Sequence, residues 1–272
     1  MNFVFWFYLV GLVIASFQDL KRREVDNWLN LLLIVGGFGY LIFEAIYGNF
    51  NLLYFGILSF FCVFILANLF YYSRIFAGGD AKLLVAMFAL FAAPSLFEMI
   101  INVVSFAFLL LLAGGLWGLC FGGVLFFKNW KKVRKEFLGM LISRYSIILF
   151  GLGVIFLIMG IWKIIILFLG IFVLVSYFLW IFAKSIEKKI MIKNIRGKDL
   201  REGDWLVDDV KIGKKLIESS FEGLSKSDVA LLRKKKFVKI KEGLPFVPGF
   251  LIAFLIWVFY QQEILNFMGF LV

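Results

Sequence analysis

The chain has 272 residues, of which 63% are hydrophobic, 19% aromatic and only 17% charged. This composition excludes an ordinary soluble globular protein, in which about a quarter of the residues are charged. The net charge is +11 and there is no histidine, which excludes histidine-based nucleophiles and general bases and most zinc sites. The excess of basic residues is better explained by orientation in a membrane than by nucleic-acid binding, so no nucleic-acid partner is expected.

Continuous apolar runs dominate the first quarter of the chain and predict membrane-spanning helices rather than a barrel of short strands. The first predicted span covers about residues 2–18. No basic segment precedes it, so a retained span is expected instead of a cleaved signal peptide. A short charged loop follows at 19–26, and further spans are predicted at 28–47 and 52–72.

The next polar break, SRIFAGGD at 73–80, leads into a short fourth span. That span is predicted to begin at Ala81, and it becomes poorly defined near Pro94 because proline disfavours helix for the residue before it. A fifth span is predicted at about 100–127, and the basic stretch KNWKKVRKEF at 128–137 is expected to form a loop.

The apolar stretch at 138–182 is too long for one crossing of the bilayer. As one helix it would measure about 65 Å, roughly twice the hydrocarbon thickness, so two spans with a turn near 159–163 are predicted. The last span is expected at about 246–267.

Residues 184–243 are unlike the rest, because charged residues are frequent and apolar runs are short. The pieces KKIMIKNI and DWLVDDVKI have the character of strands and are separated by turn glycines. Ser225 followed by Asp228 is typical of a helix start. This region therefore predicts a small water-exposed α+β module.

Together these patterns predict an all-α polytopic membrane protein of about eight transmembrane helices, with a small cytoplasmic α+β module inserted before the last helix. Residues 1–183 would form a membrane domain of seven spans, 184–244 the cytoplasmic module, and 245–272 a last helix packed with the membrane domain. With sides alternating at each span, every basic residue except Lys163 lies at the inner face. This asymmetry predicts that both termini lie outside the cell membrane.

Two aspartates come to the same cytoplasmic face in this topology, Asp19 at the end of the first span and Asp80 at the start of the fourth. Two carboxyls held close in a partly dehydrated place cannot both ionise easily, so one keeps a proton. The ionised acid can then accept a proton from water while the protonated one polarises a peptide carbonyl. Gly78 and Gly79 would permit an unusual backbone and the close approach of a substrate strand.

Other interpretations of the same residues stay open at this point. Asp80 after two glycines is also typical of a plain loop or a helix N-cap, and Asp19 with its basic neighbours of a solvated loop. Asp19 and Asp80 could instead carry protons in a secondary transporter, although such proteins tend to have internal repeats and broken helices at the midplane. A non-catalytic scaffold of a secretion system is a further alternative.

Two motifs give the chain a resemblance to a known family: DLKRREVDNW at 19–28 and AGGDAKL at 77–83. The sequence resembles the archaeal preflagellin and prepilin peptidases, relatives of the bacterial type IV prepilin peptidases. The residues that match the family's two aspartate motifs are Asp19, Arg23, Val25, Asn27, Gly78, Gly79, Asp80 and Lys82. The charged module and the segment EGLPFVPGFLIA also resemble archaeal members. In place of the first glycine of the family's GxGD motif the chain has Ala77.

The resemblance implies a membrane aspartic endopeptidase of the GxGD type, with Asp19 and Asp80 as the catalytic pair and no cofactor or metal. Its substrates would be pilin or archaellin precursors, which carry a short basic leader before an apolar helix, and cleavage would occur at the cytoplasmic face of the plasma membrane. Glu24 and Asp26 are candidates for binding the leader. The paired CxxC motifs of large bacterial members are missing, since the two cysteines are Cys62 and Cys120, so cleavage without methylation is expected.

Overall fold

The computed structural model describes residues 3–212, 215–220 and 223–271, the last segment without the side chains of 264, 265 and 267–271. It divides the chain into two compact units. Unit 1 holds residues 1–120 together with 245–272, and unit 2 holds residues 121–244. The expected functional division near residue 184 remains a prediction.

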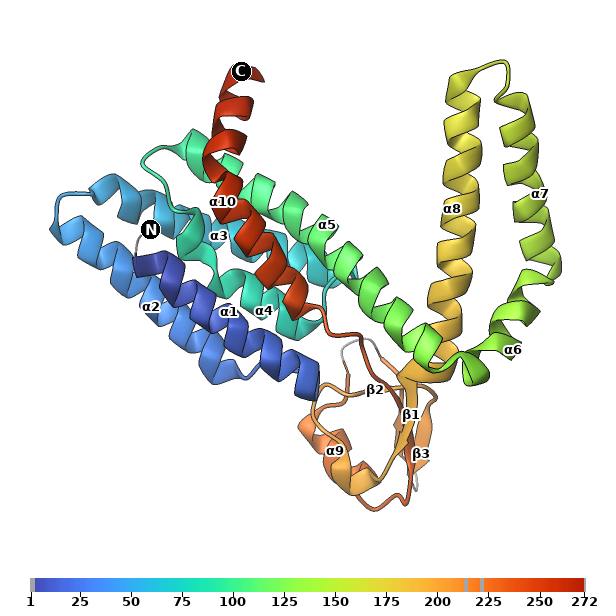
Figure 1. Ribbon diagram of the computed structural model, residues 1–272. Coiled ribbons are helices and arrows are strands. Elements are labelled where there is room, and N and C mark those ends of the chain that lie inside the picture. Colours follow the sequence, from blue (N-terminus) through green and yellow to red (C-terminus); the bar gives the residue numbers. More distant parts are fainter. Residues whose placement is uncertain (1–2, 213–214, 221–222, 272) are drawn as a thin grey trace. The chain divides into compact units, whose positions relative to one another are not determined.

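Unit 1 is a bundle of helices that joins the two ends of the chain (Figure 1). Its elements are α1 (Phe3–Arg22), α2 (Asn27–Ile46), α3 (Phe50–Tyr72), α4 (Gly78–Ala86), the 3₁₀ turn η1 (Phe88–Phe91), most of α5 (Leu96–Lys128) and α10 (Val247–Leu271). The helices α1, α2, α3 and α5 are each long and apolar enough to cross a membrane.

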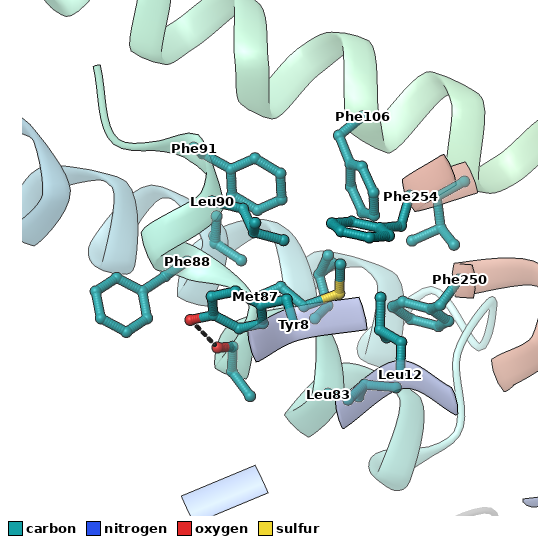
Figure 2. Packing of buried hydrophobic residues seen from close by; sticks show 14 of the residues in the cluster. Tyr8, Leu12, Leu83, Met87, Phe88, Leu90, Phe91, Phe106, Phe250 and Phe254 are labelled. Carbon is teal, nitrogen blue, oxygen red and sulfur yellow. Dashed lines mark hydrogen bonds between the residues drawn. The ribbon is translucent and has the colours of Figure 1, made fainter. Parts of the chain in front are cut away.

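The core of unit 1 lies where α1, α4, η1, α5 and α10 meet, and Figure 2 shows part of it. Phe5 of α1 stacks on Phe254 of α10 with ring centroids 5.5 Å apart. Gly11 of α1 lies against the side chain of Leu33, and an added Cβ would come within 2.5 Å of that leucine. Close helix approach at small residues is typical of membrane bundles, where packing replaces the hydrophobic driving force.

The predicted fourth span is not a continuous membrane-crossing helix. α4 has nine residues, about 14 Å of helix against a hydrocarbon core of about 30 Å. It gives way to η1 and then to a loop before Leu96. Gly48, which follows α2, and Pro94, which follows η1, both line a cavity of about 830 Å³. The broken segment that begins at α4 therefore reaches the opposite end of unit 1.

Side chains from other helices satisfy the backbone carbonyls that this break frees. The Tyr8 hydroxyl donates to the carbonyl of Ala86 at 3.0 Å, the bond dashed in Figure 2. The Ser59 hydroxyl donates to the carbonyl of Phe88 at 2.9 Å. Because non-helical backbone at membrane depth is tolerated only where its polar groups find partners inside the protein, α1 and α3 stabilise the break.

Besides the end of α5 and the strand module, unit 2 contains the long helices α6 (Trp130–Leu141), α7 (Arg144–Met159) and α8 (Ile164–Ile186). α7 and α8 form an antiparallel hairpin whose turn lies where the sequence predicts it (Figure 1). The expected basic loop at 128–137 is wrong, since most of it forms α6. Between the charged residues, apolar residues recur at helical spacing and form an apolar stripe; they are Trp130, Val133 and Phe137.

The strand module of unit 2 follows a π-helical turn at Glu187–Met191. Its strands are β1 (Ile192–Ile195), β2 (Trp205–Leu206), β3 (Val210–Ile212), β4 (Lys215–Ile217) and β5 (Val238–Lys241), with a 3₁₀ turn at Gly197–Asp199 and the helix α9 (Lys226–Leu232). One antiparallel sheet has the order β1-β5-β2, and β3 and β4 form a separate hairpin. As predicted, Ser225 caps α9 by accepting the N–H of Asp228 at 3.2 Å.

The chain is thus a mostly helical, multi-pass membrane protein with a small strand module near its C-terminal end. Five described helices can cross a membrane by length and composition, or six if the bent pair α6–α7 is one span. α10 contains a shorter apolar segment, Val247–Glu263. The predicted number of eight spans is not confirmed, and the departure is clearest at α4.

Candidate active site

The first aspartate motif lies at the end of α1, where the helix stops abruptly. Arg23 adopts a left-handed backbone with φ of 61°, and its N–H donates to the carbonyl of Asp19 at 2.8 Å. A non-glycine residue in this conformation is uncommon and ends a helix sharply. The chain can therefore turn within four residues and begin α2 at Asn27.

Hydrogen bonds fix the turn between α1 and α2. The backbone N–H of Asp26 donates to Gln18 Oε1, and Gln18 Nε2 donates back to Asp26 Oδ2, both at 3.0 Å. Arg22 and Trp28 also donate to Oδ2 of Asp26, at 2.6 and 3.2 Å. The hydrogen bond from Arg22 is the main cause of a lowered pKa at Asp26. One oxygen of this carboxylate is thus engaged within the loop, while Glu24 is exposed.

Asp19 is buried, with 6% of its surface exposed. Its Oδ2 accepts the backbone N–H of Val247 at 2.9 Å, and Val247 is the first residue of α10. The positive charge of Arg23 also acts on this carboxyl. A helix N-terminus carries unpaired N–H donors and a partial positive charge, so α10 supplies a partner suited to a carboxylate.

The loop before α10 is held by α5 and by the segment that precedes the second motif. Trp117 of α5 donates its indole N–H to the carbonyl of Pro245 at 2.8 Å. The Phe246 ring lies against Gly114, where an added Cβ would come within 2.1 Å of it, and against Phe76 at 5.3 Å between ring centroids. The start of α10 therefore packs beside both aspartate motifs.

The second motif opens α4. Asp80 lies in the first turn of the helix, where its Oδ2 accepts the N–H of Ala77 at 3.2 Å. The carboxyl reaches back to the residue before the helix, as the acidic member of a capping box does. Gly78 and Gly79 belong to the first turn of α4 and have ordinary helical backbone, so the expected unusual conformation is wrong. An added Cβ at Gly79 would meet nothing within 4 Å, which leaves open space beside Asp80.

Asp80 lies in α4, outside the candidate membrane spans, and is a half-buried residue. Burial, and then the neighbouring negative charge of Asp19, raise the pKa of Asp80 to about 7, against an ordinary value of 3.8. The N–H of Ala77 opposes this shift. The two carboxyls thus lie within electrostatic reach of each other although they are 61 positions apart in the sequence.

A direct hydrogen bond joins the two motifs. Lys82 of α4 donates from Nζ to Oδ1 of Asn27 at 3.1 Å. Asn27 is the first residue of α2. Lys82 therefore ties the helix carrying Asp80 to the turn that follows Asp19.

Sequence reasoning missed parts of this site. Val247 contributes a backbone N–H, which no side-chain pattern reveals, although the two prolines around it do indicate a helix start. Ser16 and Asn30 are buried on either side of the first motif in the sequence, and their side-chain polar atoms find no hydrogen-bond partner among the described residues. Buried polar groups of this kind destabilise a fold, and proteins tolerate them mainly at functional sites.

In the part of the chain that the structure describes, no group of three cysteine, aspartate or glutamate residues is placed to hold an ion. The chemistry available at Asp19 and Asp80 is proton transfer between carboxyls and water.

Comparison with known proteins agrees with this geometry. Residues 6–126 match the model of the type IV leader peptidase family. A protein named preflagellin peptidase from Methanococcus maripaludis is 37% identical over 86 residues, which is 30% of this chain and 35% of that relative. The matched part thus spans about a third of the relative's length, and no solved structure matches the chain significantly. Both aspartate motifs lie inside the matched segment, whereas α10 lies outside it. Residues 6–126, which include Asp19 and Asp80, are thus similar to the type IV leader peptidase family.

Proposed function

We propose that this protein is a membrane aspartic endopeptidase that removes the short basic leader from precursors of type IV pilin-like or archaellin subunits. The observation that carries the proposal is the coupling of Asp19 and Asp80 across two separate helices within a segment that matches the leader peptidase family. Such a pair can hydrolyse a peptide bond without histidine or metal.

The surroundings of the two carboxyls support different roles for them. Asp19 accepts an N–H at the start of α10, which favours its charged form, so we assign it the role of general base. Asp80, with its raised pKa, is assigned the role of proton donor. Water attacks the carbonyl carbon while Asp19 takes its proton, and Asp80 gives a proton to the carbonyl oxygen. The tetrahedral diol then breaks its C–N bond as the proton on Asp19 passes to the leaving nitrogen and one diol hydroxyl returns a proton to Asp80, which restores both carboxyls.

The substrate is proposed to pass beside Gly78 and Gly79, where there is room for an extended backbone next to Asp80. Its basic leader would meet the exposed Glu24 and the free oxygen of Asp26, and its apolar helix would lie against the spans in the bilayer. The distribution of lysine and arginine supports a cytoplasmic location for this site and for the strand module. A proton transporter or a scaffold is favoured by no particular contact of the described residues.

The purified protein, reconstituted in lipid, tests this function with candidate precursors of pilins and archaellins. We expect a shortened product whose new N-terminus, determined by mass spectrometry, lies at the boundary between the basic leader and the apolar helix. Proton flux in proteoliposomes without precursor cleavage would instead support the transporter. The absence of both cleavage and proton flux would support the scaffold.

The hydrogen bond between Lys82 and Asn27 is expected to support activity by positioning α4. Lys82→Met and Asn27→Ala should each lower the cleavage rate about three- to tenfold, because loss of an exposed hydrogen bond costs about 1 kcal/mol. The double variant should be no slower than the slower single variant, since the two residues act as a pair. Lys21→Met, which removes an exposed lysine of α1, is the control and should retain full activity. Additive losses in the double variant would contradict the pairing.

The raised pKa of Asp80 predicts that the protein becomes less stable as pH rises from about 4 to about 7. In this window the unfolded carboxyl has lost its proton while the folded one retains it, so the folded state binds more protons and its advantage declines with pH. Above about 7 both forms are charged and the effect is complete. Asp80→Asn should therefore gain thermal stability relative to the unaltered protein between pH 5 and pH 8, measured by melting in detergent.

The matched control for the pH experiment is Asp209→Asn in unit 2. Hydrogen bonds from Ser219 lower the pKa of Asp209, so this carboxyl is charged throughout the same window in the folded and unfolded states. Its replacement should leave the slope of stability against pH unchanged. An equal change of slope in both variants would contradict the assignment to Asp80.

A further inference from the structure

The hairpin of α7 and α8 has the character of a lipid-embedded element. The two helices approach closely at Gly153 and Gly170, where an added Cβ would come within 2.6 and 2.7 Å of the opposite helix. Their outward side chains are large and apolar, among them Ile148, Phe168 and Phe172. α8 has 23 residues and measures about 34 Å, close to the hydrocarbon thickness.

The two ends of this hairpin differ in charge. Its closed end carries the exposed Trp162 and one basic residue, Lys163. At its open end lies a group that we call the basic collar, formed by Lys128, Lys131, Lys132, Arg134, Lys135, Lys184, Lys188 and Lys189. Aromatic and basic residues are typical of the levels where a helix leaves the hydrocarbon, and the collar marks the cytoplasmic level by the positive-inside rule.

Acidic residues neutralise only part of the collar. Glu136 pairs with Lys188 and Lys189 at 3.0 and 3.4 Å. Glu187 pairs with Lys184 at 2.8 Å and with Lys241 of β5 at 2.6 Å. The four basic residues on the exposed side of α6 form no ion pair with any residue that the structure describes; they are Lys131, Lys132, Arg134 and Lys135.

α6 is amphipathic and bends away from the hairpin. Val133 and Phe137 pack into a small cluster with Phe126 and Ile186, so the apolar side of α6 is covered. The break between α6 and α7 bends the chain by 68°. α7 packs antiparallel on α8, which is long and apolar enough to cross the bilayer. A helix bent by 68° from α7 then runs nearly along the membrane surface, and its basic side lies at the level of the headgroups.

From these observations we propose that α6 is an interfacial helix whose exposed basic side binds the phosphate groups of anionic lipids. Four neighbouring positive charges that form no ion pair with a described residue complement a negatively charged membrane surface, and each adds to the attraction. We assign the site to a lipid phosphate rather than to free phosphate because the adjoining hairpin supplies the apolar surface that the acyl chains would cover. This lipid site does not depend on peptide cleavage.

The test measures lipid binding to the full chain in detergent, by native mass spectrometry during titration with phosphatidylglycerol or phosphatidylcholine. Phosphatidylglycerol should bind more tightly than phosphatidylcholine, and high salt should weaken it. A variant carrying K131Q, K132Q, R134Q and K135Q should bind phosphatidylglycerol at least about tenfold more weakly. Inorganic phosphate in excess should not displace the lipid.

The control variant carries R233Q, K234Q, K235Q and K236Q, which removes the same charge from another exposed basic run and should leave lipid binding unchanged. The proposal is overturned if the α6 variant binds phosphatidylglycerol as the unaltered protein does. It is also overturned if the control variant loses more binding than the α6 variant, or if phosphatidylcholine binds equally well.

Discussion

Asp19→Asn and Asp80→Asn should each lower leader cleavage by about a thousandfold or more, because asparagine has the shape of aspartate but cannot exchange a proton. The double variant should be hardly slower than either single variant, since the two carboxyls act as one unit. Cleavage of a co-expressed precursor, followed by the mobility and mass of the product, measures the effect.

The control for these variants is Asp209→Asn, which alters an exposed carboxyl of unit 2 that accepts the N–H of Ser219. It should retain activity within a few-fold of the unaltered protein, since loss of one exposed hydrogen bond costs about 1 kcal/mol. If Asp19→Asn and Asp80→Asn both still process the precursor, the peptidase assignment is lost and the scaffold becomes the better explanation.

Val247→Pro is the second change expected to have a large effect. Proline lacks the N–H that reaches Asp19, but it is well accepted at the first position of a helix, so α10 should still form. Loss of a hydrogen bond to a charged group costs about 1.5–3 kcal/mol, which corresponds to a roughly tenfold to hundredfold slower cleavage. Steady-state rates on a leader-containing peptide, with melting temperatures recorded in parallel, measure both consequences.

Val247→Ala is the matched control, because it shortens the same buried side chain but keeps the N–H. It should lose thermal stability through poorer packing while its activity falls less than about threefold. Equal activity in the proline and alanine variants would show that α10 does not support Asp19.

The long spans could be predicted from the sequence because length and apolarity alone determine which segments fit a bilayer. α1, α2 and α3 follow the predicted ranges closely, and the turn between α7 and α8 lies at the expected residues. The cap at Ser225 also follows from a local pattern, since the serine and Asp228 belong to the same helical turn.

The break after α4 could not be predicted, because it depends on contacts between distant segments. Ala86 and Phe88 lie in an apolar run that resembles any other span, and the hydroxyls of Tyr8 and Ser59 stabilise the interrupted backbone.

α6 was missed for a different reason. Its high charge suggested a loop, although the spacing of its apolar residues already indicated a helix.

Of the candidate site, the sequence indicated the two carboxyls and their motifs but not what surrounds them. A shared membrane face could be inferred from the charges of the loops, whereas the contact between Phe246 and Phe76 depends on tertiary packing. The role of Asn27 as acceptor for Lys82 likewise needed coordinates, since 55 positions separate the two residues.

The dependence of Asp19 on the first residue of α10 has a consequence for biosynthesis. A nascent chain carries both aspartates long before the ribosome reaches Val247, yet it lacks the donor that holds Asp19. The newborn protein would stay inactive until α10 has entered the membrane, so that synthesis of this helix would switch the activity on.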